Sequence, residues 1–185
     1  GTARPHVPAR GMAWALSCTA GLALLFPAHW DLDKLSEGSN VYFFPQQWGK
    51  VIDHAESAEG GLTTVTQSAD GLLTLLTNGK FQGNNSEQGE MIAQKSIALI
   101  PLLHTAQRDT ALVIGYGTGM TPRVIHENEF RSLDIAELSE DMVRLADRHF
   151  ENINHAVTSQ PGVNTYYTDG RNFLLTQSKE YDLIS

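Results

Sequence analysis

The sequence has little cysteine and little positive charge, and each shortage excludes a class of function. Its single cysteine, Cys18, excludes an internal disulfide and has no second thiolate with which to hold a metal ion. Lys and Arg together number 13 against 21 for Asp and Glu, giving a formal net charge of -8, whereas a nucleic-acid-binding surface needs clustered positive charge. We therefore expect no bound metal, no nucleic-acid partner and a reducing compartment.

A hydrophobic run of full transmembrane length is also missing. Segment 12–26 is apolar and uncharged and follows Arg4 and Arg10, but it is shorter than the about 20 residues that a bilayer-spanning helix needs. Three interpretations stay open: the core of a signal peptide, a helix buried against the domain or a partner, and the end of a transmembrane helix that begins before Gly1. We favour the third, with a parent protein integral to the membrane and this domain in the cytoplasm.

The composition along the chain predicts three parts. Residues 1–47 comprise the apolar segment and a connector. Residues 48–89 contain short runs rich in Val, Ile, Thr and Leu, and Asn78-Gly79 between two of them predicts a hairpin with a type I′ turn. We therefore expect a β-hairpin unit over 48–89 and a partial adenosyl-cofactor-binding domain over 90–185.

Strand and helix patterns alternate from residue 110 onward. Expected strands cover 112–114, 132–136, 163–168 and 181–185, and expected helices cover 140–150, with Ser139 as its N-cap, and 171–177. This order predicts an α/β fold, a Rossmann-like doubly wound sheet of the class I methyltransferase type, preceded by the small antiparallel β-unit. Since such sheets have further strands, we expect this one to be incomplete at the C-terminus, within a longer protein.

A further helix is expected over 91–104, ahead of the parallel sheet. Its apolar positions follow a helical period, which predicts an apolar face that packs inward and a polar face that carries Gln94 and Lys95. The predicted inward residues are Met91, Ile92, Ile97, Ala98, Ile100 and Leu102.

The segment Leu112-Val113-Ile114-Gly115-Tyr116-Gly117-Thr118-Gly119 organises the predicted site. Three aliphatic residues end at three glycines, as a buried strand does when the chain turns into a helix against a ligand. The glycine spacing is G-x-G-x-G rather than the G-x-G-x-x-G of dinucleotide sites. This spacing favours a ligand of the S-adenosylmethionine type.

Two carboxylates follow the next two expected strands. Glu137 suits a ribose, because a carboxylate accepts from both hydroxyls of a diol, and Asp169 suits the exocyclic amine of adenine, with Gly170 leaving room for the base. For each acid alone, a solvated side chain at a strand end is the alternative. Together with the glycine loop they predict an adenosyl site.

Several motifs over residues 50–185 occur in the order of a known family. They are Leu76-Thr77-Asn78-Gly79-Lys80-Phe81-Gln82, Glu90-Met91, Pro101-Leu102-Leu103, the glycine loop, Ile135-Ala136-Glu137, Thr168-Asp169-Gly170-Arg171-Asn172-Phe173-Leu174 and Tyr181-Asp182-Leu183-Ile184. In these motifs the chain resembles the spermidine synthases, the polyamine aminopropyltransferases. Trp30-Asp31, Leu35-Ser36 and Val41-Tyr42 resemble the junction in the branch whose domain follows a multi-span membrane region.

The resemblance implies transfer of an aminopropyl group from decarboxylated S-adenosylmethionine to a small amine or polyamine, with methylthioadenosine as product. We also expect a homodimer. The family's general base, an Asp just after the Tyr-Asp-x-Ile strand, would lie after Ser185, so we assign no catalytic residue. The implied cofactor-binding residues are Gln82, Gly115, Gly117, Thr118, Gly119, Glu137, Leu138, Asp169 and Gly170.

The chain departs from the family at two places. Thr118 stands where the family loop carries an Asp expected to hold the cofactor's amine, and Gln88-Gly89-Glu90-Met91 stands in place of Tyr-His-Glu-Met. A neutral hydroxyl cannot form the charge-assisted bond that selects an ammonium group. Two alternatives therefore stay open: a methyltransferase that uses intact S-adenosylmethionine, and a non-catalytic module that binds an adenosyl metabolite.

Overall fold

The computed structural model describes Ser17, Thr19, Gly21 and residues 29–185. The chain divides into two compact units, Gly1–Asp31 and Leu32–Ser185, and the elements below all lie in the second. The apolar segment 12–26 lies outside the described residues, apart from those three. None of the helices in the described part has the length and apolar character needed to cross a bilayer. The membrane-associated parent, the homodimer and the three-part domain boundaries stay predictions.

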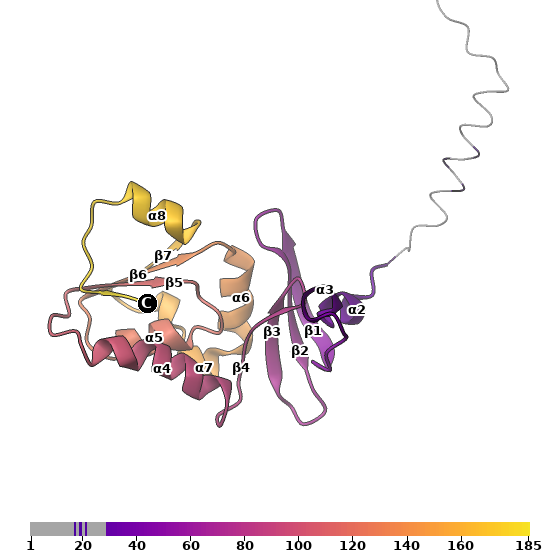
Figure 1. Cartoon of the computed structure of the whole chain (residues 1–185), viewed down its shortest axis with the longest axis horizontal. Coiled ribbons are helices and arrows are strands. Elements are labelled where there is room, and N and C mark those ends of the chain that lie inside the picture. The colour runs from indigo at the N-terminus through magenta and orange to yellow at the C-terminus, as the bar shows by residue number, and fades with distance from the viewer. Residues whose placement is uncertain (1–16, 18, 20, 22–28) are drawn as a thin grey trace, which may run out of the picture. The chain divides into compact units, whose positions relative to one another are not determined.

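Two sheets and a set of helices make up the second unit (Figure 1). The strands are β1 (Lys50–Ser57), β2 (Gly61–Gln67), β3 (Leu73–Thr77), β4 (Lys80–Asn84), β5 (Thr110–Ile114), β6 (Ser132–Glu137), β7 (Val163–Tyr167) and β8 (Leu183–Ile184). The helices are α2 (Leu32–Ser36), α3 (Ser39–Tyr42), α4 (Glu90–Leu102), α5 (Met120–His126), α6 (Glu140–His149), α7 (Glu151–Asn154), the 3₁₀ helix η1 (Val157–Ser159) and α8 (Gly170–Thr176).

The first sheet is antiparallel, with strand order β1-β2-β3-β4. Asn78 and Gly79 join β3 to β4 as a two-residue turn, with φ values of 50° and 77°. Positive φ at both positions is what a type I′ turn requires, so the predicted hairpin is confirmed. On one face of this sheet, α2 is held by a hydrogen bond that Ser36 Oγ donates to Thr64 Oγ1.

The second sheet is parallel, with strand order β7-β6-β5-β8. Leu133 and Ile135 of β6 pack into the main core with α4, α5 and α6, whereas Ala136 packs with Leu112 and with Phe173 of α8. Helices therefore cover both faces, as Figure 1 shows with α8 opposite α4 and α5. The predicted α/β fold with a preceding antiparallel β-unit is confirmed.

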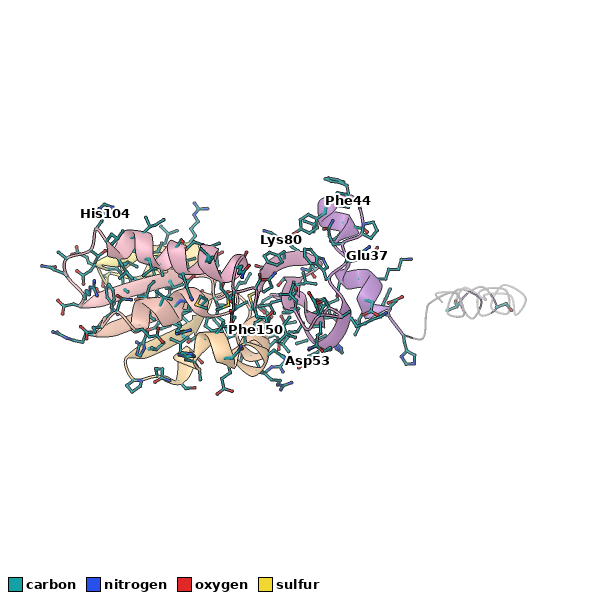
Figure 2. The ribbon with its side chains drawn as sticks, turned by 90° about the horizontal axis from the view of Figure 1, so that it is seen from below. Glu37, Phe44, Asp53, Lys80, His104 and Phe150 are labelled. Carbon is teal, nitrogen blue, oxygen red and sulfur yellow. The ribbon has the colours of Figure 1, made fainter. Side chains whose placement is uncertain are left out.

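Helix α6 forms as its sequence predicts. Ser139 caps it, with its Oγ accepting from the Met142 N–H, and the apolar face packs into the core. Ala55, Val65 and Leu75 of the antiparallel sheet belong to the same core cluster. At this junction Asp53 of β1 accepts from Arg148 and His149 of α6, and Figure 2 labels Asp53 there beside the buried Phe150.

Helix α4 does not bury the face that its apolar residues predict. Ala98 and Leu102 are buried as expected, but Gln94 shares their stripe and is also buried. Ile92, Ile97 and Ile100, predicted to face inward, are more than half exposed. The predicted orientation is therefore wrong in part, because the polar contacts of Gln94 select the buried stripe.

Candidate functional site

The glycine loop runs from the end of β5 to the start of α5. Gly115, Gly117 and Gly119 all have positive φ, at 90°, 56° and 82°, which other residues rarely adopt. A side chain at Gly119 would stand 2.6 Å from Asn154 Cβ, whereas the space beside Gly115 is open. The loop thus packs tightly at its helix end and leaves room at its strand end.

Glu137 lies directly behind this loop. It ends β6, the neighbour of β5 in the parallel sheet, and is buried. Its Oε2 accepts from the Tyr116 N–H at 2.8 Å (N···O), and its Oε1 accepts from the Ser139 N–H at 2.9 Å. One carboxylate therefore links the loop to the start of α6 and still keeps lone pairs for further donors.

The side chain of Tyr116 anchors the glycine loop to α6. Its hydroxyl donates to Asp147 Oδ1, and Thr158 Oγ1 donates to Asp147 Oδ2 at 2.6 Å. Asn154 Nδ2 donates to the Thr118 carbonyl at 3.2 Å. Burial, reinforced by the Asp147 carboxylate, raises the pKa of the Tyr116 hydroxyl far above its ordinary value, so the hydroxyl remains a donor.

Asp169 and Gly170 follow β7, at the same carboxyl edge of the sheet. Asp169 is exposed and caps α8, with Oδ1 accepting from the Asn172 N–H at 2.9 Å. A side chain at Gly170 would stand 2.4 Å from Ile114 Cγ2, so this glycine permits close packing of α8 on β5. Leu138, which follows Glu137, is about half exposed. Contacts of these residues with a nucleoside stay predictions.

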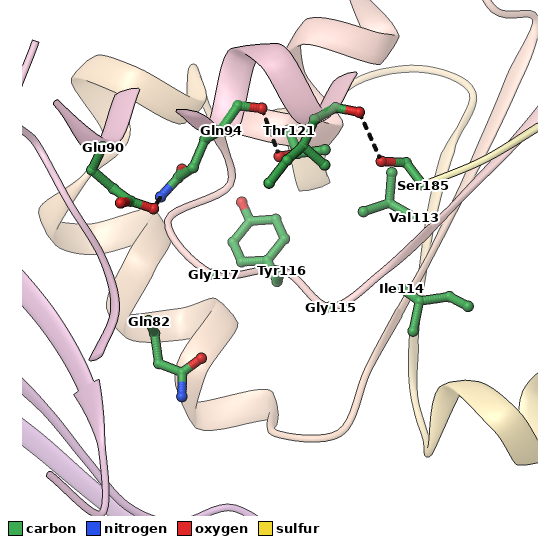
Figure 3. Close-up of a pocket in the computed structure, with 11 residues that line it drawn as sticks. Gln82, Glu90, Gln94, Val113, Ile114, Gly115, Tyr116, Gly117, Thr121 and Ser185 are labelled. Atoms are coloured by element: carbon green, nitrogen blue, oxygen red, sulfur yellow. Dashed lines mark hydrogen bonds between the residues drawn. The ribbon is translucent and has the colours of Figure 1, made fainter. Parts of the chain in front are cut away.

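A cavity of about 250 Å³ lies between the glycine loop, β4 and α4 (Figure 3). Of the predicted site residues, Gln82, Gly115 and Gly117 line it, but Thr118, Gly119, Glu137, Leu138, Asp169 and Gly170 do not. Thr118 is fully buried, with its hydroxyl donating to Gln94 Oε1 at 2.6 Å. The structure thus places the predicted residues other than Gln82 at the carboxyl edge of the parallel sheet, and it brings Gln82 of β4 together with Gly115 and Gly117 in one cavity.

Other polar residues of the cavity were not predicted from the sequence, namely Glu90, Gln94, Tyr116, Thr121 and Ser185. Gln94 was predicted on the polar face, but it is buried, and its Nε2 donates to Glu90 Oε1 at 3.1 Å. The i, i+4 spacing of these two residues was the available signal. Among the described residues, no group of three His, Cys, Asp or Glu side chains could hold a metal ion.

The segment that leads into β8 is held by a buried carboxylate. Asp134 Oδ2 accepts from Lys179 Nζ at 2.7 Å and from Tyr181 Oη at 2.8 Å, and its Oδ1 accepts from Asn164. Burial raises the pKa of this carboxyl, but these hydrogen bonds outweigh burial and the net pKa is below its ordinary value. The ionised Asp134 therefore fixes the path of the chain toward Ser185, at the cavity.

Comparisons with known proteins agree with this architecture. The solved structure of a spermidine synthase in complex with the transition-state analogue AdoDATO matches with a TM-score of 0.63 and 17% identity, over 73% of this chain and 45% of that chain. The spermidine synthase from Thermotoga maritima matches with the same values. The fold is therefore like that of spermidine synthase, with an antiparallel four-stranded sheet preceding the parallel one.

Curated relatives point the same way. The polyamine aminopropyltransferase of Alkaliphilus oremlandii is 31% identical over 100 residues, covering 54% of this chain and 35% of the relative. That of Methanocaldococcus jannaschii is 29% identical over 111 residues, covering 60% and 37%. No family model matches the chain.

These matches define an α/β protein of spermidine-synthase-like fold. Over somewhat more than half of its length, the chain is a distant homologue of the polyamine aminopropyltransferases. The matched stretch spans little more than a third of those relatives' own length, 35% and 37%.

Proposed function

We propose that the chain binds a cofactor of the S-adenosylmethionine type along the carboxyl ends of β5, β6 and β7. The observation that carries this proposal is Glu137, whose carboxylate lies behind the glycine loop with both oxygens on backbone N–H groups. That arrangement fixes the carboxylate for a ribose diol, which offers two O–H donors. Distant homology to polyamine aminopropyltransferases supports the same choice of ligand.

The remaining predicted residues take their roles from their positions. Asp169, Gly170 and Leu138 would hold the adenine beyond the ribose. Gln82, Gly115 and Gly117 line the cavity that would receive the sulfonium end of the cofactor. Thr118 and Gly119 would shape the loop between these two regions.

We further propose that the parent protein transfers the aminopropyl group of decarboxylated S-adenosylmethionine to a small amine or polyamine. The neutral amine attacks the methylene carbon bound to the sulfonium. A C–N bond forms as the C–S bond breaks, and sulfur keeps the electron pair, so methylthioadenosine leaves as a neutral thioether. The product ammonium then releases one proton, and we assign its acceptor to none of the described residues.

A methyltransferase that uses intact S-adenosylmethionine is the second candidate. The observation that favours it is Thr118, whose neutral and buried hydroxyl donates to Gln94 and supplies no charge for an amine of the cofactor. Titration calorimetry with methylthioadenosine and both forms of the cofactor separates the candidates. Tighter binding of the decarboxylated form supports aminopropyl transfer, and tighter binding of the intact form supports the methyltransferase. Binding of no adenosyl ligand would refute both.

Replacement of Glu137 tests the ribose contact directly. Glu137→Ala should weaken methylthioadenosine binding by about 2 kcal/mol, because it removes charge-assisted hydrogen bonds. The control is Glu140→Ala, an exposed acid three residues further along the chain, at the start of α6. Since Glu137 also holds the loop, a thermal melt of each variant shows whether the fold survives. Unchanged affinity in a folded Glu137→Ala protein would contradict the assignment.

A further inference from the structure

Glu90 differs from every other side chain at the cavity. Among the described residues that line it, Glu90 alone carries a formal charge. The other polar groups there are amides and hydroxyls, including Gln82, Gln94 and Thr121, and the remaining lining is apolar or glycine. The cavity therefore has a negative potential with no basic side chain to balance it.

Among the described residues, the carboxylate of Glu90 has one hydrogen-bond partner. Its Oε1 accepts from Gln94 Nε2 at 3.1 Å, and none of the ion pairs in residues 29–185 includes it. Glu90 is half-buried, so it has lost part of its hydration. A partly desolvated carboxylate without a countercharge favours a cationic ligand.

The side-chain amide of Gln94 is held by hydrogen bonds at both its oxygen and its nitrogen. Its Oε1 accepts from the Thr118 hydroxyl, so its Nε2 is directed at Glu90. The chemistry requires this orientation, since an ionised carboxylate can only accept and must face the amide nitrogen. In addition, Thr121 Oγ1 donates to the backbone carbonyl of Gln94 at 3.1 Å, as Figure 3 shows. A hydrogen-bonded chain therefore runs from the glycine loop through Gln94 to Glu90.

Gly83 of β4 makes room for this chain. A side chain at Gly83 would stand 2.5 Å from Gln94 Nε2 and 2.9 Å from Thr118 Cγ2. Any other residue there would displace either the amide or the threonine. The strand, the loop and the helix thus fit together at the point where Gln94 is buried.

From these contacts we propose that Glu90 binds a primary alkylammonium group in the cavity and that Gln94 and Thr118 are positioning residues for its carboxylate. The proposal deepens the proposed function and rests on it, because an adenosyl cofactor at the glycine loop would bring its tail to this cavity. Two ligands carry the required chemistry: the aminopropyl tail of the decarboxylated cofactor and the amine that accepts it. The binding experiment distinguishes them.

Titration calorimetry on the full chain uses three probes. These are methylthioadenosine, which has no ammonium group, decarboxylated S-adenosylmethionine, and 1,4-diaminobutane added in the presence of methylthioadenosine. Glu90→Gln keeps the size of the side chain and removes its charge. Glu87→Gln, an exposed acid just before α4, is the matched control.

We expect Glu90→Gln to weaken one of the two ammonium ligands by about tenfold to a hundredfold, with methylthioadenosine affinity unchanged. Loss confined to the cofactor identifies its tail as the group bound, and loss confined to the diamine identifies the acceptor. If methylthioadenosine binds and both ammonium ligands keep their affinity in Glu90→Gln, the ammonium site is refuted and the proposed function stands. If methylthioadenosine does not bind, the proposed function fails, and the Glu90 site is tested by the diamine alone. That site is refuted if the diamine does not bind, or if it binds Glu90→Gln as tightly as it binds the wild type.

The positioning role of Thr118 has its own test. Thr118→Val removes the hydroxyl at nearly constant shape, and Thr118→Ser restores it. The affinity for the Glu90-dependent ligand, taken relative to that for methylthioadenosine in the same variant, should fall by about threefold to tenfold in the valine variant and recover in the serine variant. Equal affinities in the two variants would show that the hydroxyl does not position Glu90.

Discussion

Helices α6 and α4 pack by different rules, although the sequence predicts a buried apolar face for both. Helix α6 buries Met142, Val143, Leu145 and Ala146, and none of its charged residues is fully buried. Helix α4 buries Gln94 in its central stripe and leaves Ile100 60% exposed. Hydrophobic periodicity therefore determines which face of α6 is buried, whereas a polar network determines the buried face of α4.

The two helices also differ in whether they line the cavity. Helix α6 joins the two sheets through apolar contacts and the pairing of Asp53 with His149. Helix α4 lines the cavity with Glu90 and Gln94. Local sequence rules tend to fail where a site imposes its own requirements, which supports a functional role for α4.

The largest predicted effect is the difference in stability cost between truncating a buried apolar residue of α6 and an exposed apolar residue of α4. Leu145→Ala on α6 removes a fully buried side chain and should lower the free energy of unfolding by about 2–5 kcal/mol. Ile100→Ala on α4 should change it by less than about 0.5 kcal/mol, because the side chain is mostly exposed. Urea denaturation of both variants measures the two values, and similar costs would contradict the contrast between the helices.

A smaller effect is expected from the buried amide of α4. Gln94→Leu leaves the buried Thr118 hydroxyl without its acceptor, which should cost about 1–3 kcal/mol of unfolding free energy. The double variant Gln94→Leu/Thr118→Val removes both partners and should recover most of that loss. If the double variant is no more stable than the single one in the same denaturation experiment, the hydrogen bond does not explain the burial of Gln94.

The smallest effect concerns the junction of α6 with the antiparallel sheet. The hydrogen bond from His149 outweighs burial and, with Arg148 and the His54 N–H, lowers the pKa of Asp53 to about 2. Asp53→Asn should therefore cost about 1 kcal/mol at neutral pH, a modest value because the pair is partly exposed.

The pH dependence of that cost has a defined sign. A carboxyl with a lowered folded-state pKa stabilises the fold above its unfolded value, here 3.8, and loses the contribution as the pH falls through about 2. The stability difference between the wild type and Asp53→Asn should thus be constant above pH 3.8 and fade below it. Glu56→Gln, an exposed acid of the same strand, is the control. A difference independent of pH would rule out the ionised pair as its source.

Much of the fold follows from local sequence. Asn78 and Gly79 determine a hairpin because few other residues adopt positive φ, and the Ser139 cap marks the start of α6. The three glycines after β5 determine a tight turn for the same backbone reason. Each of these signals depends on neighbours within a few residues.

The contacts within the site could not be predicted in that way. Thr118 lies far from Glu90 and Gln94 in the sequence, and the three form one hydrogen-bonded chain only because α4 packs beside the loop. Tyr116 and Asp147 meet because α6 lies beneath the glycine loop. These pairs depend on tertiary packing, so the sequence identified the loop and its carboxylates but not the polar groups that support them.

Tyr116 gives the glycine loop a property that its glycines alone would not. Three glycines at alternate positions would leave a chain free to sample many conformations. The Tyr116 N–H on Glu137 and its hydroxyl on Asp147 hold this loop in one of them by the protein's own hydrogen bonds. The entropy of ordering the loop is therefore lost during folding rather than during ligand binding, which makes the site preorganised and leaves more of each ligand contact to be expressed as affinity.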